Sequence, residues 1–492
     1  MNIQLDFGGF DPSFIGVSVR FGNARSFDFY KAYTKSASPL PVSQMGHDER
    51  FEALSIASVL SHEIRHFHDF LLTPYSARVF ALRIRMLIYL LQALPEIVKD
   101  GPNCVPVPFA TWCGLDEAER EAQLAWLPPR ADGERWRPVQ LPRIVKGMPA
   151  DNGPMAQALA KVLTLREEIR ELAYNPAGQG KDASIQPWHI FELPAVFVQM
   201  SELWHTYGAE ETNFYFKYLN DAGPNPYSTM LRRTHKLWDD KGRLMDLNVA
   251  NAMATWCLLG SYKKDEWKAC PTERYDRLCL HLSEVGVPEW GGDASALFNQ
   301  WSMALDLSTV HDGIKEARDN FHATHVAIKA KAGSLAQTVV GASGTEFLQR
   351  VTRAVGSASD HMMQSFESEP NAYVSPHRYL KSVDRYVNPL YRKVYAGGLL
   401  SSGENEASLK QRGATVQWGR EVNGRLLVES LVEPYPLSEH RFLDAEDALL
   451  LAGLNGLGDF LVSDTDRVSI DVQRSGEVFL GGTHLRAFEV FV

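Results

Sequence analysis

Cysteine is scarce in this chain: only five of its 492 residues are cysteine. No two of them have the spacing of a C-x-x-C pair. Disulfide frameworks and cysteine zinc sites depend on denser and more regular cysteines. The sequence therefore argues against both kinds of site and favours a reducing compartment. The five residues are Cys104, Cys113, Cys257, Cys270 and Cys279.

An excess of positive charge is also missing. The 50 Lys and Arg residues are outnumbered by 60 Asp and Glu residues, which gives a formal net charge of -10. Proteins that bind nucleic acid usually carry a basic footprint that neutralises phosphates. We therefore expect no nucleic-acid partner.

Long hydrophobic runs are lacking too. The most apolar stretch, 79–94, is interrupted by Arg83 and Arg85 and is shorter than the roughly 20 residues that a membrane-spanning helix requires. The first residues, MNIQLDFGGFDPSF, have neither the basic start nor the apolar segment of a secretory signal. We expect a cytoplasmic protein without a membrane span.

Several common catalytic motifs are absent from the chain. It contains no G-x-S-x-G, no G-x-x-x-x-G-K-[ST] and no G-x-G-x-x-G after a strand-like segment. These motifs mark many serine hydrolases, P-loop NTPases and dinucleotide-dependent enzymes. The sequence argues against all three classes.

The composition that remains is that of an ordinary globular protein, with 45% hydrophobic and 22% charged residues. Hydrophobic patterning divides the chain into four regions. Residues 1–100 contain strand-like segments followed by two helical stretches, and residues 101–155 are a Pro- and Trp-rich insertion. Residues 156–400 are a helical body. Residues 409–492 alternate like short strands, with one short helix.

These regions predict an α+β fold. Its N-terminal strands pack on a helix that spans about 48–73, its body is large and mainly helical, and its C-terminal region is small and β-rich. The predicted strands are the segments IQLDF, FIGVSVRFG and SFDFYKAY. Asp48 is the expected N-cap of the helix, which ends near Pro74 because proline disfavours a helical conformation in the residue before it.

The sequence HEIRH, 62–66, places ionisable residues within this otherwise apolar helix. His62 and His66 are four residues apart and therefore share one helix face, where both imidazoles can bind one zinc ion. Glu63 is rotated by about 100° from His62, beside the metal, where it can take a proton from a metal-bound water. The alternative is a core cluster of paired side chains without a metal, but buried ionisable groups are costly unless paired or bound to metal.

H-E-x-x-H resembles the active-site helix of the zincin metallopeptidases. The resemblance implies a sheet packed against the motif helix, with an edge strand that receives extended substrate, and the strands of residues 1–35 are the candidates. The longer metzincin pattern does not fit, because Asp69 stands where that pattern has glycine and Leu72 where it has a third histidine. The other zincin pattern implies a third ligand from a glutamate on a downstream helix.

Glu192 is the best candidate for this third ligand. It stands in the apolar segment 188–208, where an unpaired carboxylate would be expensive. Glu192-x-x-Ala195 is similar to the glutamate-plus-small-residue spacing of the glutamate zincins. Because Glu192 follows His66 by 126 residues, the intervening Pro- and Trp-rich region must be an insertion. The rival candidates are Glu202 in the same segment and Glu167, Glu168 and Glu171 in a charged run.

Four further residues are candidates for supporting roles. Asp69 shares the face of the two histidines and could accept a hydrogen bond from His66, although a direct ligand or a helix-end role is also open. Gln199, seven residues after Glu192, could orient that ligand, contact substrate or hydrogen-bond in the core. His205 and Tyr207 are candidates for stabilising a tetrahedral oxyanion, as a His or Tyr often does in zincins.

Together these features predict a zinc metallopeptidase that hydrolyses peptide bonds and has a narrow intracellular protein target. The substrate is a protein or peptide, and the C-terminal region is a candidate surface for a protein partner. The competing hypothesis is a non-catalytic metal-binding or scaffold protein that acts through protein–protein interaction, for example in a toxin or defence system.

Overall fold

The computed structural model describes the chain in a series of segments, and most of the residues in them are helical. Among the described residues, no helix is both long enough and apolar enough to cross a membrane. The described residues are 8–11, 16–21, 29, 32–33, 39–99, 103–125, 127, 133–145, 148–149, 153–174, 185–221, 226–240, 242–261, 270–387, 391–396, 414–422, 425–433, 445–454, 457–458, 460–464, 469–472, 475, 478–480 and 483–484.

The motif helix is α2 (His47–Leu72), and α3 (Pro74–Ile97) follows it directly. Pro74 is the first residue of α3, and Thr73 between the two helices is extended, with φ -101° and ψ 123°. Proline favours this arrangement because it suits the first turn of a helix and disfavours a helical residue before it. The predicted N-cap is wrong by two residues: Gly46 is the N-cap and Asp48 lies in the first turn.

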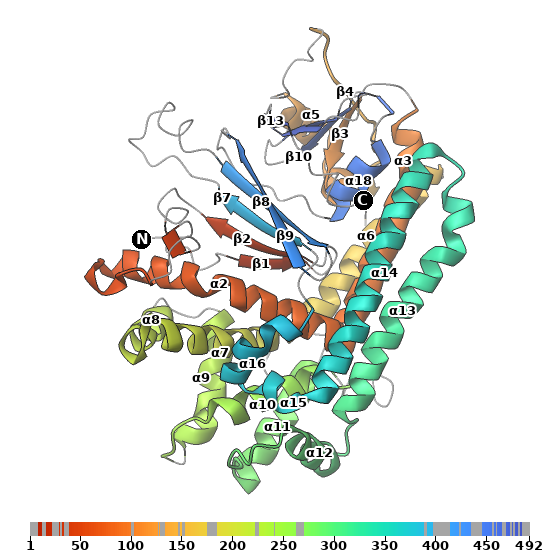
Figure 1. Ribbon diagram of the computed structural model, residues 1–492. Helices are drawn as coiled ribbons and strands as arrows, with labels where there is room; N and C mark the ends of the chain where they lie inside the picture. The colour runs from red at the N-terminus through yellow and green to blue at the C-terminus, as the bar shows by residue number, and fades with distance from the viewer. Residues whose placement is uncertain are drawn as a thin grey trace.

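A five-stranded sheet covers one side of α2 (Figure 1). Its strand order is β1-β2-β7-β8-β9; β2 and β7 are parallel, and the other pairs are antiparallel. Phe10 of β1 packs edge-on against Phe67 and Phe70 of α2, with ring centroids 5.9 and 5.1 Å apart. N-terminal strands thus pack on the motif helix. Strand β2 falls within the predicted segment FIGVSVRFG, whereas the predicted segment IQLDF lies outside the described residues. The strands are β1 (Gly8–Asp11), β2 (Gly16–Phe21), β7 (Tyr391–Ala396), β8 (Ala414–Val422) and β9 (Arg425–Glu433).

One prediction about the strands is wrong, because Phe29, Ala32 and Tyr33 of the predicted strand SFDFYKAY are helical, and the other residues of that segment lie outside those described. The C-terminal region contains the strands β8 to β13, as its β-rich pattern predicts. Its strands β8 and β9 extend the N-terminal sheet. Strand pairing over such a distance leaves no local signal in the sequence.

Residues 101–155, which the sequence predicts as an insertion, share a second sheet with the C-terminal region. A six-stranded sheet has the order β13-β12-β11-β10-β3-β4, in which β3 (Asn103–Val107) runs parallel to β10 (Phe460–Asp464). Beside it, the backbone N–H of Phe109 donates to the carboxylate of Glu446, in helix α18 (Ala445–Leu454), at 2.8 Å. The remaining strands are β4 (Arg137–Pro138), β11 (Ser469–Val472), β12 (Val478–Leu480), β13 (Thr483–His484) and a separate pair, β5 (Ile144–Val145) and β6 (Met148–Pro149).

Helices make up most of the described chain and cover the other side of α2 (Figure 1). The largest is the pair α13 and α14, which packs beside α3. The remaining helices are α4 (Phe109–Gly114), α5 (Glu117–Leu124), α6 (Pro154–Tyr174), α7 (Pro187–Tyr207), α8 (Ala209–Asp221), α9 (Pro226–Asp239), α10 (Leu247–Leu258), α11 (Pro271–Val285), α12 (Ala294–Ala304), α13 (Val310–Leu335), α14 (Val339–Ser368), α15 (Pro370–Val374), α16 (Pro376–Ser382) and α18 (Ala445–Leu454), with short 3-10 turns at Val42–Gln44 and Val383–Arg385.

Helix α7 lies antiparallel to α2. Glu192, near the start of α7, contacts His62, whereas Gln199, two turns later, donates a hydrogen bond to Ser58 Oγ at 3.0 Å. Gln199 also donates to the hydroxyl of Tyr215 on α8 at 3.0 Å. This one buried amide therefore links three helices next to the motif.

A buried polar cluster fixes the second half of α2. Arg65 is fully buried; its Nε donates to Asp69 Oδ2 at 3.0 Å and its Nη1 donates to the backbone carbonyl of Tyr373 at 2.9 Å. The Tyr373 hydroxyl completes the ring of contacts by donating to Asp69 Oδ1 at 2.6 Å. The guanidinium also lies 4.0 Å from the centre of the Tyr373 ring, in cation–π contact.

His68 extends this cluster on the next face of the helix. It accepts from the Tyr379 hydroxyl at Nδ1 (2.6 Å) and donates from Nε2 to the carbonyl of Val387 (2.7 Å). Burial is the main reason that its pKa falls to about 3, so the ring is neutral. His68 therefore belongs to the packing of α2 and not to the candidate metal site.

We predict that Asp69→Ala lowers the free energy of unfolding by about 3–5 kcal/mol, because it leaves the buried Arg65 charge without its counter-ion. Denaturant unfolding followed by circular dichroism measures the loss. The matched control is Glu346→Ala, which removes an exposed ion pair of the same i,i+4 spacing with Arg350 and should cost less than about 1 kcal/mol. Equal losses in the two variants would contradict the structural role of Asp69.

Candidate metal centre

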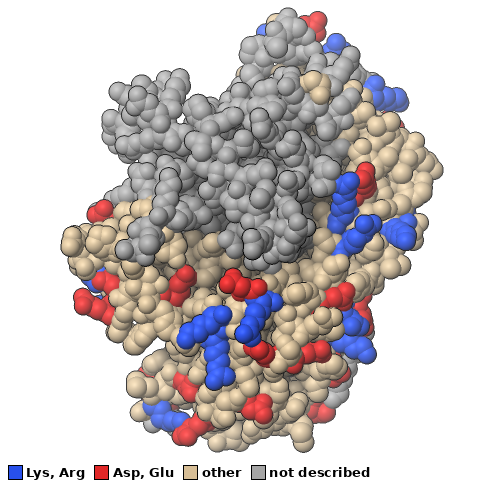
Figure 2. All heavy atoms as spheres, viewed as in Figure 1, with Lys and Arg blue, Asp and Glu red and all other residues tan. Residues whose placement is uncertain are grey.

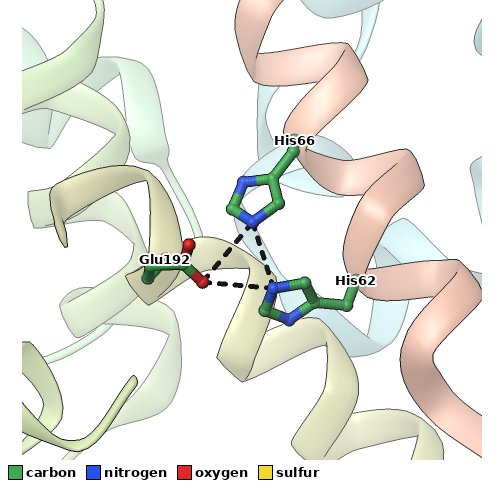
Figure 3. Close-up of side chains that lie close together, drawn as sticks. All are labelled: His62, His66 and Glu192. Atoms are coloured by element: carbon green, nitrogen blue, oxygen red, sulfur yellow. Dashed lines mark hydrogen bonds and ion pairs between the residues drawn. The ribbon is translucent and has the colours of Figure 1, made fainter. Parts of the chain in front are cut away.

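His62 and His66 of α2 point their rings toward the same position (Figure 3). Their Nε2 atoms are 3.0 Å apart, and the rings meet edge to face with centroids 4.7 Å apart. Side-chain exposure is 6% for His62 and 12% for His66. The helical spacing predicted from the sequence thus brings two imidazole nitrogens together in a nearly enclosed place.

Glu192 of α7 meets the two histidines. Its Oε2 lies 3.1 Å from His62 Nε2 and 3.5 Å from His66 Nε2, and 15% of its side chain is exposed (Figure 3). Ligand atoms of the three side chains all lie within 4.8 Å of one another, and within the described part of the chain no other group of three His, Cys, Asp or Glu residues is this close. The structure therefore brings together the three predicted ligands.

The local sequence explains how α7 presents Glu192. The helix starts at Pro187, which suits a first position, so Glu192 lies in the second turn. Pro194 lies inside the helix, and both it and Ala195 are buried. A small side chain at Ala195 suits the close packing of α7 against α2. This is in keeping with the Glu192-x-x-Ala195 spacing in the sequence.

The carboxyl of Glu192 is held in its charged form. Burial alone would raise its pKa, but the charge of His66 and the hydrogen bonds from His62 and His66 outweigh burial and hold the pKa well below its usual range. An ionised carboxylate next to two imidazoles is the form that a metal ligand requires.

The three contacts conflict if only protons hold them. A carboxylate can only accept hydrogen bonds, so both histidines would have to present an N–H at Nε2 to Glu192. Those two N–H groups would then face each other with their nitrogens 3.0 Å apart. One divalent cation resolves the conflict because it accepts a lone pair from each of the three groups. Two imidazoles and one carboxylate are a donor set that fits a catalytic zinc ion.

Glu63 lies next to His62 on α2 and is 5% exposed. It is rotated by about 100° from His62 and about 60° from His66. Its side chain therefore leaves the helix to one side of the two imidazoles and not in line with them.

Glu202, the rival ligand, lies near α2 but outside the triad. Its carboxylate accepts from the hydroxyl of Ser61 and, at 3.2 Å, from that of Tyr33. Burial is the main cause that raises the pKa of this carboxyl, which is the opposite of what is found at Glu192. Gln199 takes the core hydrogen-bonding role among those that the sequence left open, because its amide donates to Ser58 and Tyr215 and so links α2, α7 and α8.

Three predictions for supporting residues are not met. Asp69 binds Arg65 and Tyr373 in place of His66. His205 and Tyr207 lie 13 and 15 residues beyond Glu192 on one continuous helix, which places them about 20 Å away along its axis. His205 contacts His377 instead. Neither residue is placed to stabilise an oxyanion at the triad.

His189 is a site residue that sequence reasoning missed. It stands three residues before Glu192, and this spacing, which puts both on one side of α7, is the signal that could have found it. The backbone N–H of Gln186 donates to its Nδ1 at 3.1 Å, so the neutral ring carries its proton on Nε2. Partial burial lowers the pKa of His189 and the Glu192 charge opposes this, so the ring is neutral and close enough to Glu192 to respond to its charge.

Comparisons with protein-family models, curated proteins and solved structures return no match. The interpretation of the site therefore depends on its geometry and chemistry.

We predict that the triad of the purified chain binds one zinc ion and that Glu192→Ala weakens this binding by at least 100-fold, because one of three ligands is lost. Isothermal titration and elemental analysis measure affinity and content. Glu202→Ala is the matched control, since it removes a buried carboxylate from the same helix and should leave zinc affinity unchanged. Loss of zinc from Glu202→Ala but not from Glu192→Ala would contradict the assignment.

Proposed function

We propose that this chain is a zinc-dependent peptidase that hydrolyses peptide bonds. The observation that supports it best is the meeting of Glu192 with His62 and His66, two segments that lie 126 residues apart in the sequence. The HExxH spacing alone can arise by chance, whereas a third ligand of the right chemistry at the same point is a separate requirement.

Each residue of the site has a distinct task in this proposal. His62, His66 and Glu192 hold the ion, which when bound supplies a Lewis acid and makes water in the site a nucleophile near neutral pH. Glu63 takes a proton from the attacking water and passes it to the amine that leaves when the C–N bond breaks. Its place beside the histidines, without being one of the three ligands, suits this work.

The surroundings of the site favour an extended peptide as substrate. Strand β1 is the edge of its sheet and packs on α2 through Phe10. An edge strand can bind an extended peptide through its free backbone groups. The low exposure of the three ligands, 6–15%, favours a narrow target over general proteolysis. On the face drawn in Figure 2, acidic and basic side chains of the described residues are interspersed, which does not favour a polyanionic partner.

We predict that Glu63→Gln lowers kcat by at least 1000-fold while one zinc ion stays bound, because the amide keeps the shape of the side chain but cannot accept the proton. The measurement uses zinc-loaded chain, a fluorescence-quenched peptide library of random sequence, and elemental analysis. Glu202→Gln is the control and should retain activity. A wild-type chain that contains zinc but cleaves no peptide would reject the peptidase and favour a non-catalytic metal-binding role.

We propose that His189, one turn before Glu192 on α7, stabilises negative charge on the substrate oxygen through its Nε2–H, because its Nδ1 accepts from the backbone and its ring responds to the Glu192 charge. We predict that His189→Asn, which can keep the acceptor near Nδ1 but loses the Nε2–H, lowers kcat by about 100- to 1000-fold with little change in KM or zinc content.

His189→Gln provides the comparison, since its amide N–H can reach the position of Nε2. It should retain more of kcat than His189→Asn. If both variants match wild type, His189 is only a helix-capping residue and the peptidase proposal is unaffected.

A further inference from the structure

A second pair of histidines meets at the other end of α7. Nε2 of His205, in the last turn of α7, lies against Nδ1 of His377, in the first turn of α16, with ring centroids 4.1 Å apart. The rings are tilted by 40° and do not stack. Two nitrogens that face each other can share one proton at most, or both can offer lone pairs to one cation.

The surroundings keep these nitrogens available to a cation. His205 is exposed and His377 is partly buried, so an ion and its remaining water ligands can enter from solvent.

This pair is separate from the site described above. His205 lies 13 residues beyond Glu192 on the same helix, about 20 Å along its axis. The histidine pair also joins two helices, α7 and α16, that differ from the pair α2 and α7 at the triad. Helix α16 carries Tyr379, which hydrogen-bonds His68 of α2. A cation held here would fasten the end of α7 to the helix that supports the back of α2.

We infer that His205 and His377 form a second metal site, selective for first-row transition ions that prefer imidazole, such as Zn²⁺, Ni²⁺ or Cu²⁺. With two protein ligands it binds more weakly than the three-ligand site, and water completes the coordination. Because the ion binds only where both helices are folded together, it stabilises the native chain at higher metal concentration.

The test is a calorimetric titration of the full-length, metal-stripped chain with Zn²⁺, together with thermal unfolding at increasing Zn²⁺. The wild type should show two classes of site, one tight and one at least 10-fold weaker, and a melting temperature that still rises after the tight site is filled. His205→Ala and His377→Ala should each abolish only the weak class. Glu192→Ala should abolish or weaken only the tight class.

His311→Ala is the matched control, since it removes an exposed histidine from α13 and should leave both classes intact. A single class in the wild type, or a weak class that persists in both His205→Ala and His377→Ala, would overturn the inference. Because Glu192→Ala reports on the triad separately, failure of the second site leaves the peptidase proposal untouched, and failure of the triad leaves the second site untouched.

Discussion

The central constraint on this structure is the convergence of two imidazoles and one carboxylate, which together could hold one metal ion, in a nearly enclosed place. Both imidazole nitrogens face one carboxylate oxygen, at 3.1 and 3.5 Å, and they lie 3.0 Å apart, so they cannot both donate to that oxygen without bringing their N–H groups against each other. A cation that accepts three lone pairs satisfies them at once. The packing of α7 against α2 matters because it is what brings the carboxylate to the histidines.

The fold holds this arrangement from several sides. Phe10 of the sheet packs on α2, while Gln199 ties α2 to α7 and α8 through hydrogen bonds to Ser58 and Tyr215. Behind the motif, Arg65 and Asp69 are paired in the core. Apolar packing contributes most of the stability of the fold. The buried hydrogen bonds and the buried ion pair fix the orientation of α2, the helix that carries the two histidines. A catalytic constellation needs this kind of support, because small misplacements of its groups are costly.

Much of the site was predictable because its chemistry leaves a local signal. His62 and His66 follow from helical spacing, and Glu192 stands out as a carboxylate in an apolar segment. The helical wheel places Asp69 on the face of His66, but it does not show that Arg65 at i-4 and a distant Tyr373 bind this carboxylate instead. Residue type favours His205 and Tyr207, but the rise of a continuous helix carries them away from the triad.

The fold was predictable only in part for a similar reason. The helices follow from local patterns, such as Pro74 at the start of α3 and Pro187 at the start of α7. Strand partners are set by contacts between distant segments, so the pairing of β3 with β10 and of β2 with β7 was not visible in the sequence.

X-ray diffraction from crystals of the full chain, purified without chelators and measured above and below the zinc absorption edge, tests the central claim most directly. The account predicts one strong anomalous peak within about 2.0–2.2 Å of the Nε2 atoms of His62 and His66 and of a Glu192 carboxylate oxygen. A chain whose three side chains point apart, with no anomalous peak between them, would contradict it.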